Sequence, residues 1–294
     1  AHAQASGNAS AEAGGWRVKG QAELADFDPL VWWRGAEGSA WRRGPHRLSA
    51  ELQLSGLWRR EASAVLAADT LAVDRLLTAV DGDANLLVHD SLLAGLPLSA
   101  QWRLHSQGPG VEVEGAISVA GQRFSLQGQG GGAPADDRWR AALKAPELAA
   151  LAPLGNLLTE SMPASARLWP KAGALSADVS TQGRWPALQS QGDVQAQSLA
   201  SALAQLRSAH LQWKNGATPQ SPLQAQLQAQ GLSQGEQRID RLTADITGNL
   251  RDHQVRVLVD SPARPPSWTE HLLGPADQGT RLEGQARGQW QADG

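Results

Sequence analysis

The chain has 294 residues, of which 41% are apolar, with a formal net charge of −3 and no cysteine. Lysine and arginine are dispersed, so no basic stripe marks a nucleic-acid surface, and the lack of cysteine excludes disulfides, thiol catalysis and cysteine metal ligands. No window of about 18 apolar residues is present to span a bilayer as a helix.

The first residues, AHAQASGNAS, show neither an initiator methionine nor a signal-peptide pattern, and the chain ends within an alternating pattern. We therefore expect an internal piece of a longer protein, with any membrane anchor outside it. Residues 1–14 are rich in Ala, Ser, Gly and Asn, which predicts a flexible lead-in. Residues 15–294 predict a single extended domain.

Short stretches that alternate between apolar and polar residues recur along the chain, and nearly all stop at glycine. LSAELQLSG (48–56), LQAQLQAQG (223–231) and LTADITG (242–248) are examples. Because successive side chains of a strand point to opposite faces, each stretch predicts a strand with one apolar and one polar face.

In chain order, the first strand is predicted from Trp16 to Leu24 and ends at the turn before Pro29. Residues 70–80 fit a helix or a strand, and the flanking alternation favours a strand. APELAALAPLGNLL (145–158) predicts one short helix that ends at Pro153 or Gly155, with a proline and a glutamate in its first turn. The other strands are predicted at 48–56, 98–104, 111–119, 124–128, 139–143 and repeatedly from 175 to 290.

Roughly 15–20 strands fit into the chain, and at about 4.8 Å per strand they make a sheet on the order of 70–95 Å long. A sheet so long must twist, coil or fold over its own apolar side. The predicted fold is therefore all-β: a long, curved antiparallel sheet folded into a U-shaped β-taco groove with an apolar interior, with one or two short helices.

The inward positions of these strands alternate leucine with alanine. Two facing layers of an ordinary sandwich need bulkier residues to interlock, so small residues leave room between the walls. A normal sandwich with some alanines is the alternative. The residues predicted to line the groove are Leu48, Ala50, Leu52, Leu54, Leu98, Trp102, Leu104, Val111, Val113, Ile117, Val119, Phe124, Leu126, Trp139, Leu143, Leu175, Val179, Leu211, Trp213, Leu223, Leu227, Leu242, Ile246, Val255, Val257, Val259, Leu282 and Trp290.

A lipid is the filler that the free energies favour. Each acyl methylene gains about 0.8 kcal/mol on leaving water, so a two-chain phospholipid meets a barrier of order 20 kcal/mol if it crosses water unshielded. A continuous apolar groove removes most of that barrier without a tight headgroup site. The pattern therefore predicts a conduit for acyl chains.

Motifs for other functions are weak. Gly128–Ala133 matches a dinucleotide-binding pattern, but Pro134 and another strand follow it, which favours a hairpin loop. Asp81–Asn85 resembles the start of a calcium loop, but Leu86 and Leu92 replace the required glycine and glutamate, so we expect a tight turn. No residues combine as nucleophile, base and orienting group. We expect no enzyme activity, no metal and no cofactor.

Four segments carry a family resemblance: Gly15 through Trp33 with its Phe-Asp-Pro turn, APELAALAPL (145–154), GRWPALQSQGDVQAQSLA (183–200) and GNLRDHQVRVLVD (248–260). In this order, from about residue 15 to 261, the chain resembles the TamB family, which belongs to the AsmA-like group of bridge-type lipid transfer proteins.

The resemblance implies a periplasmic β-taco segment of an inner-membrane-anchored protein of a Gram-negative bacterium. The family is implicated in phospholipid passage to the outer membrane. With a BamA-like outer-membrane barrel, it is also implicated in translocation and assembly of outer-membrane proteins. Phospholipid acyl chains would be the ligand, and the barrel would meet parts outside this fragment.

Two other functions stay open. One is a scaffold that pairs an extended strand of an outer-membrane protein or autotransporter with a sheet edge during insertion or secretion. The other is a β-helical surface adhesin, although that fold shows a more uniform coil repeat than this chain does.

Overall fold

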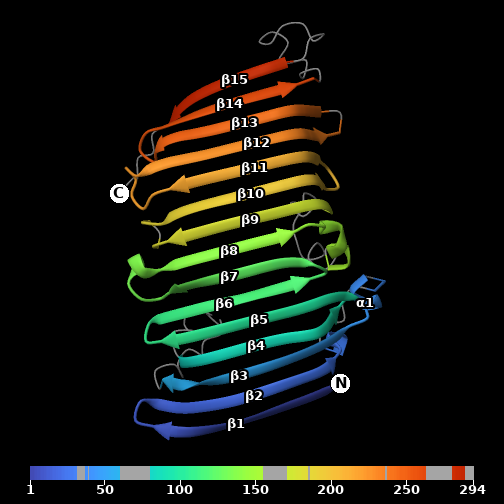
Figure 1. The fold of residues 1–294 in the computed structure, drawn as a ribbon, viewed down its shortest axis with the longest axis vertical. Coiled ribbons are helices and arrows are strands. Elements are labelled where there is room, and N and C mark those ends of the chain that lie inside the picture. The colour runs from blue at the N-terminus through green and yellow to red at the C-terminus, as the bar shows by residue number, and fades with distance from the viewer. Residues whose placement is uncertain are drawn as a thin grey trace. The chain divides into compact units, whose positions relative to one another are not determined.

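The computed structural model describes residues 1–31, 37–38, 40–59, 80–154, 171–184, 186–235, 237–262 and 280–288. It is an all-β protein in which the order of the strands is their order in the chain, from β1 to β15 (Figure 1). Every pairing with a defined register is antiparallel. The prediction of an all-β, open antiparallel sheet with few short helices is confirmed.

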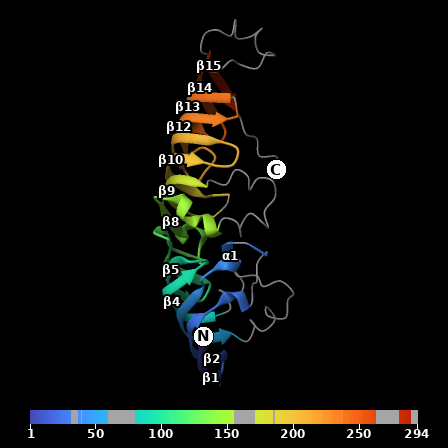
Figure 2. The same cartoon turned by 90° about the vertical axis from the view of Figure 1, so that its right-hand side faces the viewer.

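Contacts divide the chain into two compact units. Unit 1 comprises Ala1–Ala141 and Pro153–Leu158, and unit 2 comprises Ala142–Ala152 and Thr159–Gly294. β8 (Arg138–Ala145) belongs partly to each. Figure 2 shows the same strands from the side, where the ribbons of each unit curve rather than lie flat.

The strands of unit 1 are β1 (His2–Glu12), β2 (Gly15–Phe27), β3 (Arg47–Arg59), β4 (Val80–Leu93), β5 (Leu96–Gln107), β6 (Gly110–Val119) and β7 (Gln122–Gly130). Those of unit 2 are β9 (Ala172–Gln182), β10 (Gln189–Ala200), β11 (Gln205–Asn215), β12 (Pro222–Gln234), β13 (Gln237–Asn249), β14 (His253–Ser261) and β15 (Thr280–Gly288). The described helical elements with defined bounds are η1 (Pro29–Val31), α1 (Ala40–Arg43), η3 (Pro134–Asp136) and η4 (Leu148–Leu151).

The prediction of a flexible lead-in at residues 1–14 is wrong, because β1 occupies His2–Glu12 and pairs with β2 along its whole length. Its residues alternate as strictly as those of the other strands. The alternation is between alanine or glycine and small polar residues, and so carries little hydrophobic contrast. Backbone pairing with β2 does not depend on that contrast.

The tight turn expected at Asp81–Asn85 is also wrong, because this segment lies inside β4. Gly82 lies opposite Gly56 of β3, and a Cβ at Gly82 would come within 2.1 Å of the carbonyl oxygen of Ser55. The glycine therefore permits a close approach of two strands rather than a turn. The Asp81 carboxylate accepts hydrogen bonds from the Arg59 guanidinium at 2.7 Å and from the N–H of Gly108 at 2.6 Å.

Other local predictions have mixed outcomes. Of the glycine-rich stretch Gly128–Ala133, which was predicted as a loop, residues 128–130 are the end of β7 and residues 131–133 lie in the connection to β8. The short helix predicted to end at Pro153 or Gly155 is present as η4 (Leu148–Leu151) and helical residues 152–154, whereas residue 145 still belongs to β8. Residues 155–158 and 70–79 lie outside the described residues.

Two β-bulges bend the sheet of unit 1 on either side of β3. Asp26 in β2 and Asp90 in β4 adopt positive φ values of 52° and 45°, and the register with β3 shifts at both positions. The buried Ser91 hydroxyl accepts a hydrogen bond from the N–H of Ser49 at 2.9 Å and donates to the carbonyl of His89 at 2.8 Å. It supplies polar partners where the ladder is interrupted.

Large buried side chains are scarce in the described residues. Trp41, on α1, is 2% exposed and packs against His46, with ring centroids 4.3 Å apart and ring planes tilted by 54°. His46 lies with Nε2 2.6 Å from the Trp41 carbonyl, and its Nδ1 accepts the N–H of Ala94 at 3.0 Å. This arrangement requires a neutral ring with its hydrogen on Nε2. It attaches α1 to the hairpin between β4 and β5.

We expect Ser91→Ala to lower the free energy of unfolding by about 1–3 kcal/mol, because it leaves the buried N–H of Ser49 without a partner. Urea unfolding followed by circular dichroism measures the loss. Ser99→Ala, at an exposed position of β5, is the control and is expected to stay within about 0.5 kcal/mol of the unmodified chain. Equal effects of the two substitutions would contradict the role given to Ser91.

Candidate functional site

One face of each unit is built from continuous apolar rows. Directly opposite residues of an antiparallel pair point to the same face, so register decides which side chains meet. In unit 1 the rows across β1–β7 are Ala3–Leu24–Ala50–Val88–Ala100–Ile117–Phe124, Ala5–Ala22–Leu52–Leu86–Trp102–Gly115–Leu126, and Gly7–Gly20–Leu54–Ala84–Leu104–Val113–Gly128.

Unit 2 repeats the arrangement across β9–β15. Its rows are Leu175–Ala196–Ala209–Ala229–Leu242–Val259–Leu282, Ala177–Val194–Leu211–Leu227–Ala244–Val257–Gly284, and Val179–Gly192–Trp213–Ala225–Ile246–Val255–Ala286. We call the surface made by these rows the apolar face of each unit.

Most residues predicted to line a groove lie in these rows. The remaining ones extend the face at its margins: Leu48 is opposite Phe27, Leu98 opposite Val119, Val111 opposite Gly130, and Leu223 opposite Gly248. Trp139 and Leu143 lie on β8, and Trp290 lies outside the described residues.

Leu86 and Val88 of β4 are apolar-face residues that the sequence analysis missed, although Ala84, Leu86 and Val88 alternate there. We missed this alternation because Asp81–Asn85, which immediately precedes Leu86, was predicted to be a turn. The rows also include small residues that hydrophobicity does not mark, such as the alanines of β1 and Ala209 of β11.

Three tryptophans of the apolar face lie flat across glycines of neighbouring strands. A Cβ at Gly115 would come within 2.3 Å of the Trp102 ring, and one at Gly192 within 2.1 Å of the Trp213 ring. Trp139 covers Gly128 and Gly130 in the same way. In each case the ring covers the backbone of the next strand, at a position where any side chain larger than that of glycine would collide with it.

Hydrogen bonding holds the Trp213 ring in this position. Its Nε1 donates to the Ser190 hydroxyl at 3.1 Å, and Ser190 lies opposite Asn215, a neighbour on the same sheet margin. The polar edge of the indole is therefore satisfied within the face, and its apolar surface is left available.

The apolar faces are incompletely covered. Among the described residues, no large side chain is less than 2% exposed, and Leu54, Phe124 and Leu282 are 39%, 37% and 41% exposed. A sandwich core at native packing density would enclose such side chains fully. The apolar faces therefore have the residue composition of a protein core, but their side chains are more exposed than those of a core.

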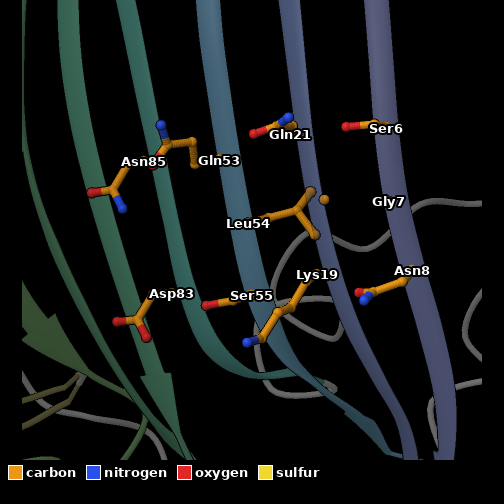
Figure 3. A pocket seen from close by; sticks show the side chains of 11 residues that line it. Ser6, Gly7, Asn8, Lys19, Gln21, Gln53, Leu54, Ser55, Asp83 and Asn85 are labelled. Carbon is orange, nitrogen blue, oxygen red and sulfur yellow. The ribbon is translucent and has the colours of Figure 1, made fainter.

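The opposite face is mostly polar in both units, although it includes apolar residues such as Leu57, Leu87 and Leu258. Over β1–β4 it forms a shallow basin of about 580 Å³ (Figure 3). Hydroxyl and amide side chains from four strands project around it, with one lysine and one carboxylate: Ser6, Asn8, Lys19, Gln21, Gln53, Ser55, Asp83 and Asn85. Leu54, a member of the apolar rows, lines the same basin together with Gly7 and Gly20.

A carboxylate with an altered pKa marks the polar face of unit 2. Asp193 of β10 accepts hydrogen bonds from Gln212 at 2.6 Å, His210 at 2.9 Å and Gln195 at 3.0 Å. These donors, with Gln212 contributing most, stabilise the charged form and lower the pKa of Asp193 to about 2. The cluster is solvent-exposed and links β10 to β11 through side-chain hydrogen bonds.

Within the described ranges, no group of three or more His, Asp or Glu side chains is placed to hold a metal ion. No helix of that part of the chain is both long and apolar enough to cross a bilayer. No family model, curated protein or solved structure matches the chain.

We expect Gly192→Ala to displace the Trp213 ring and to destabilise the chain by about 1–3 kcal/mol through overpacking. Intrinsic fluorescence and urea unfolding measure the two effects. Gly284→Ala is a matched control on the same face, because a Cβ there meets nothing within 4 Å. If the two variants unfold alike, the flat packing of Trp213 on Gly192 is not a stabilising contact.

We expect Gln212→Ala to raise the pKa of Asp193 from about 2 toward its ordinary value of 3.8. Because the folded-state pKa is the lower one, this carboxylate stabilises the fold above about pH 4, and the contribution is lost as the pH falls toward 2. Carbon-13 NMR titration of the carboxyl group measures the shift. Gln226→Ala, on the neighbouring strand and without a hydrogen bond to Asp193, should leave the titration unchanged.

Proposed function

We propose that the chain is a lipid-conduit segment whose apolar faces shield phospholipid acyl chains during passage between the inner and outer membranes. The observation that carries the proposal is the set of unbroken apolar rows that remain partly open in each unit. Each row crosses seven strands without a charged side chain.

The rows suit a mobile acyl chain better than a fixed ligand. An acyl chain needs apolar contact along its length and no hydrogen bonds, and it gains about 0.8 kcal/mol per methylene removed from water. Leucine side chains separated by alanine, glycine and indole rings offer that apolar contact along the face. No polar group interrupts the rows, so nothing on the face would hold a chain at a single position.

The resemblance to the TamB family supports the same proposal and adds its context. In that context the chain is a periplasmic part of an inner-membrane-anchored protein that supports outer-membrane biogenesis. A BamA-like barrel is the proposed partner of that protein.

A scaffold for client strands is the second candidate, and β1 favours it. All residues of this strand are exposed, and its only charged or titratable side chains, His2 and Glu12, stand at its ends. Sheet edges that avoid further pairing usually carry lysine, proline or a bulge, and the interior of β1 has none of them. An extended polypeptide would add to this edge by backbone pairing.

A photo-crosslinking amino acid distinguishes the two candidates. We expect phospholipid adducts when it replaces Leu52 or Leu227 on the apolar faces, and none when it replaces the adjacent Gln53 or Gln226 on the polar faces. Mass spectrometry of the purified chain identifies the adducts. Polypeptide adducts at Ser6 of β1, without lipid at either leucine, would favour the scaffold.

Blocking substitutions test transport itself. We expect Leu52→Arg, Leu227→Arg and Ile246→Arg together to reduce phospholipid transfer between vesicles to the rate without protein, because charges on the face must be desolvated when an acyl chain arrives. The control carries Gln53→Arg, Gln226→Arg and Thr247→Arg at adjacent positions on the polar faces. Undiminished transfer by a folded apolar-face variant would rule out the conduit.

A further inference from the structure

A cavity of about 440 Å³ lies in unit 2 where β10, β11, β12 and β13 approach their ends. Four leucine and isoleucine side chains line it, one from each strand, and register places Leu199 opposite Leu206 and Leu232 opposite Ile239. Charged side chains line the same cavity beside them. Apolar and charged groups therefore meet in one recess, which the rows of the apolar face do not offer.

Arg207 reaches into this cavity because residue 231 is a glycine. Gly231 has a φ of +64°, and a Cβ there would lie 2.8 Å from the Cβ of Arg207, 3.3 Å from its Nε and 3.5 Å from its Cζ. The side chain of Arg207 thus lies over the backbone of β12. On the next strand, β13, Arg238 lines the same cavity.

Neither guanidinium is neutralised within the described part of the chain. Arg207 and Arg238 are exposed and form no ion pair or side-chain hydrogen bond with a described residue. Asp240 is the one carboxylate among the lining residues, so the cavity carries a net charge of about +1. Guanidinium groups bind phosphate through paired N–H donors, and a phosphodiester carries one negative charge.

We propose that this cavity binds the phosphate group of a phospholipid whose acyl chains lie along the apolar face of unit 2. The proposal rests on the conduit function and names the lipid class that the conduit receives: glycerophospholipids, rather than neutral lipids of the same chain length. The aliphatic lining favours a lipid phosphate over a free phosphate ion, because leucine and isoleucine side chains contribute nothing to an inorganic anion.

Binding of two lipids that differ only in the head tests the site. Native mass spectrometry of the full chain measures the dissociation constants for phosphatidylglycerol and for diacylglycerol with the same acyl chains. The test variant is Arg207→Gln with Arg238→Gln. The control is Lys214→Gln with Arg251→Gln, which removes the same charge from exposed positions away from the cavity.

We expect the unmodified chain and the control to bind phosphatidylglycerol at least about tenfold more tightly than diacylglycerol, the scale of one charge-assisted contact. The test variant should lose this preference and retain its diacylglycerol binding. No preference in the unmodified chain, or an equal loss in the control, would overturn the headgroup site while leaving the conduit intact. Absence of binding to either lipid would overturn the conduit itself.

Inorganic phosphate is the remaining probe. We expect it not to displace phosphatidylglycerol at concentrations comparable with those of the lipid. Displacement at such concentrations would assign the cavity to small anions and overturn its assignment to lipid.

Discussion

Antiparallel pairing in register is the constraint on which the rest of the structure depends. Side chains on a strand alternate between faces with a period of two, so a slip of one residue would transfer every leucine of that strand to the polar face. Within each unit, the registers keep leucine, alanine, valine and tryptophan on one side over seven successive strands. A single displaced strand would interrupt every row that crosses it.

The bulges show that the sequence accommodates this constraint locally. At Asp26 the register with β3 shifts by one residue, and the spacing between apolar residues of β2 changes there from two to three, from Leu24 to Phe27. With an unchanged spacing of two, the extra residue would place the apolar side chains that follow it on the polar face. Instead Leu24 lies opposite Ala50 and Phe27 lies opposite Leu48, so the apolar face continues past the bend.

The strands and their two faces follow from the sequence, because leucine, alanine and valine at alternate positions specify both. This inference fails where the alternating residues differ little in hydrophobicity. β1 alternates alanine with serine and glutamine, and its pairing rests on backbone hydrogen bonds that hydrophobicity does not reveal. Contacts between strands are a second limit: the packing of Trp213 on Gly192 depends on a register that neither strand encodes alone.

The same limit applies to the polar clusters. Asp193 gains its low pKa from donors on its own strand and on β11, and the cavity around Arg207 is assembled from four strands. Gly231 reads in the sequence as the end of an alternating stretch, as many other glycines do. Only the placement of β11 beside β12 shows that this glycine makes room for a guanidinium.

The two candidate occupants would use different parts of the sheet. An extended polypeptide on an apolar face would bury N–H and carbonyl groups against leucine and alanine, and each unpaired group costs several kcal/mol. An acyl chain has no such groups and incurs no such cost. A polypeptide gains hydrogen bonds only at the edge of a sheet, where backbone groups are unpaired on one side. Lipid on the face and protein at the edge are therefore separable by chemistry, and the open rows of each unit favour the lipid.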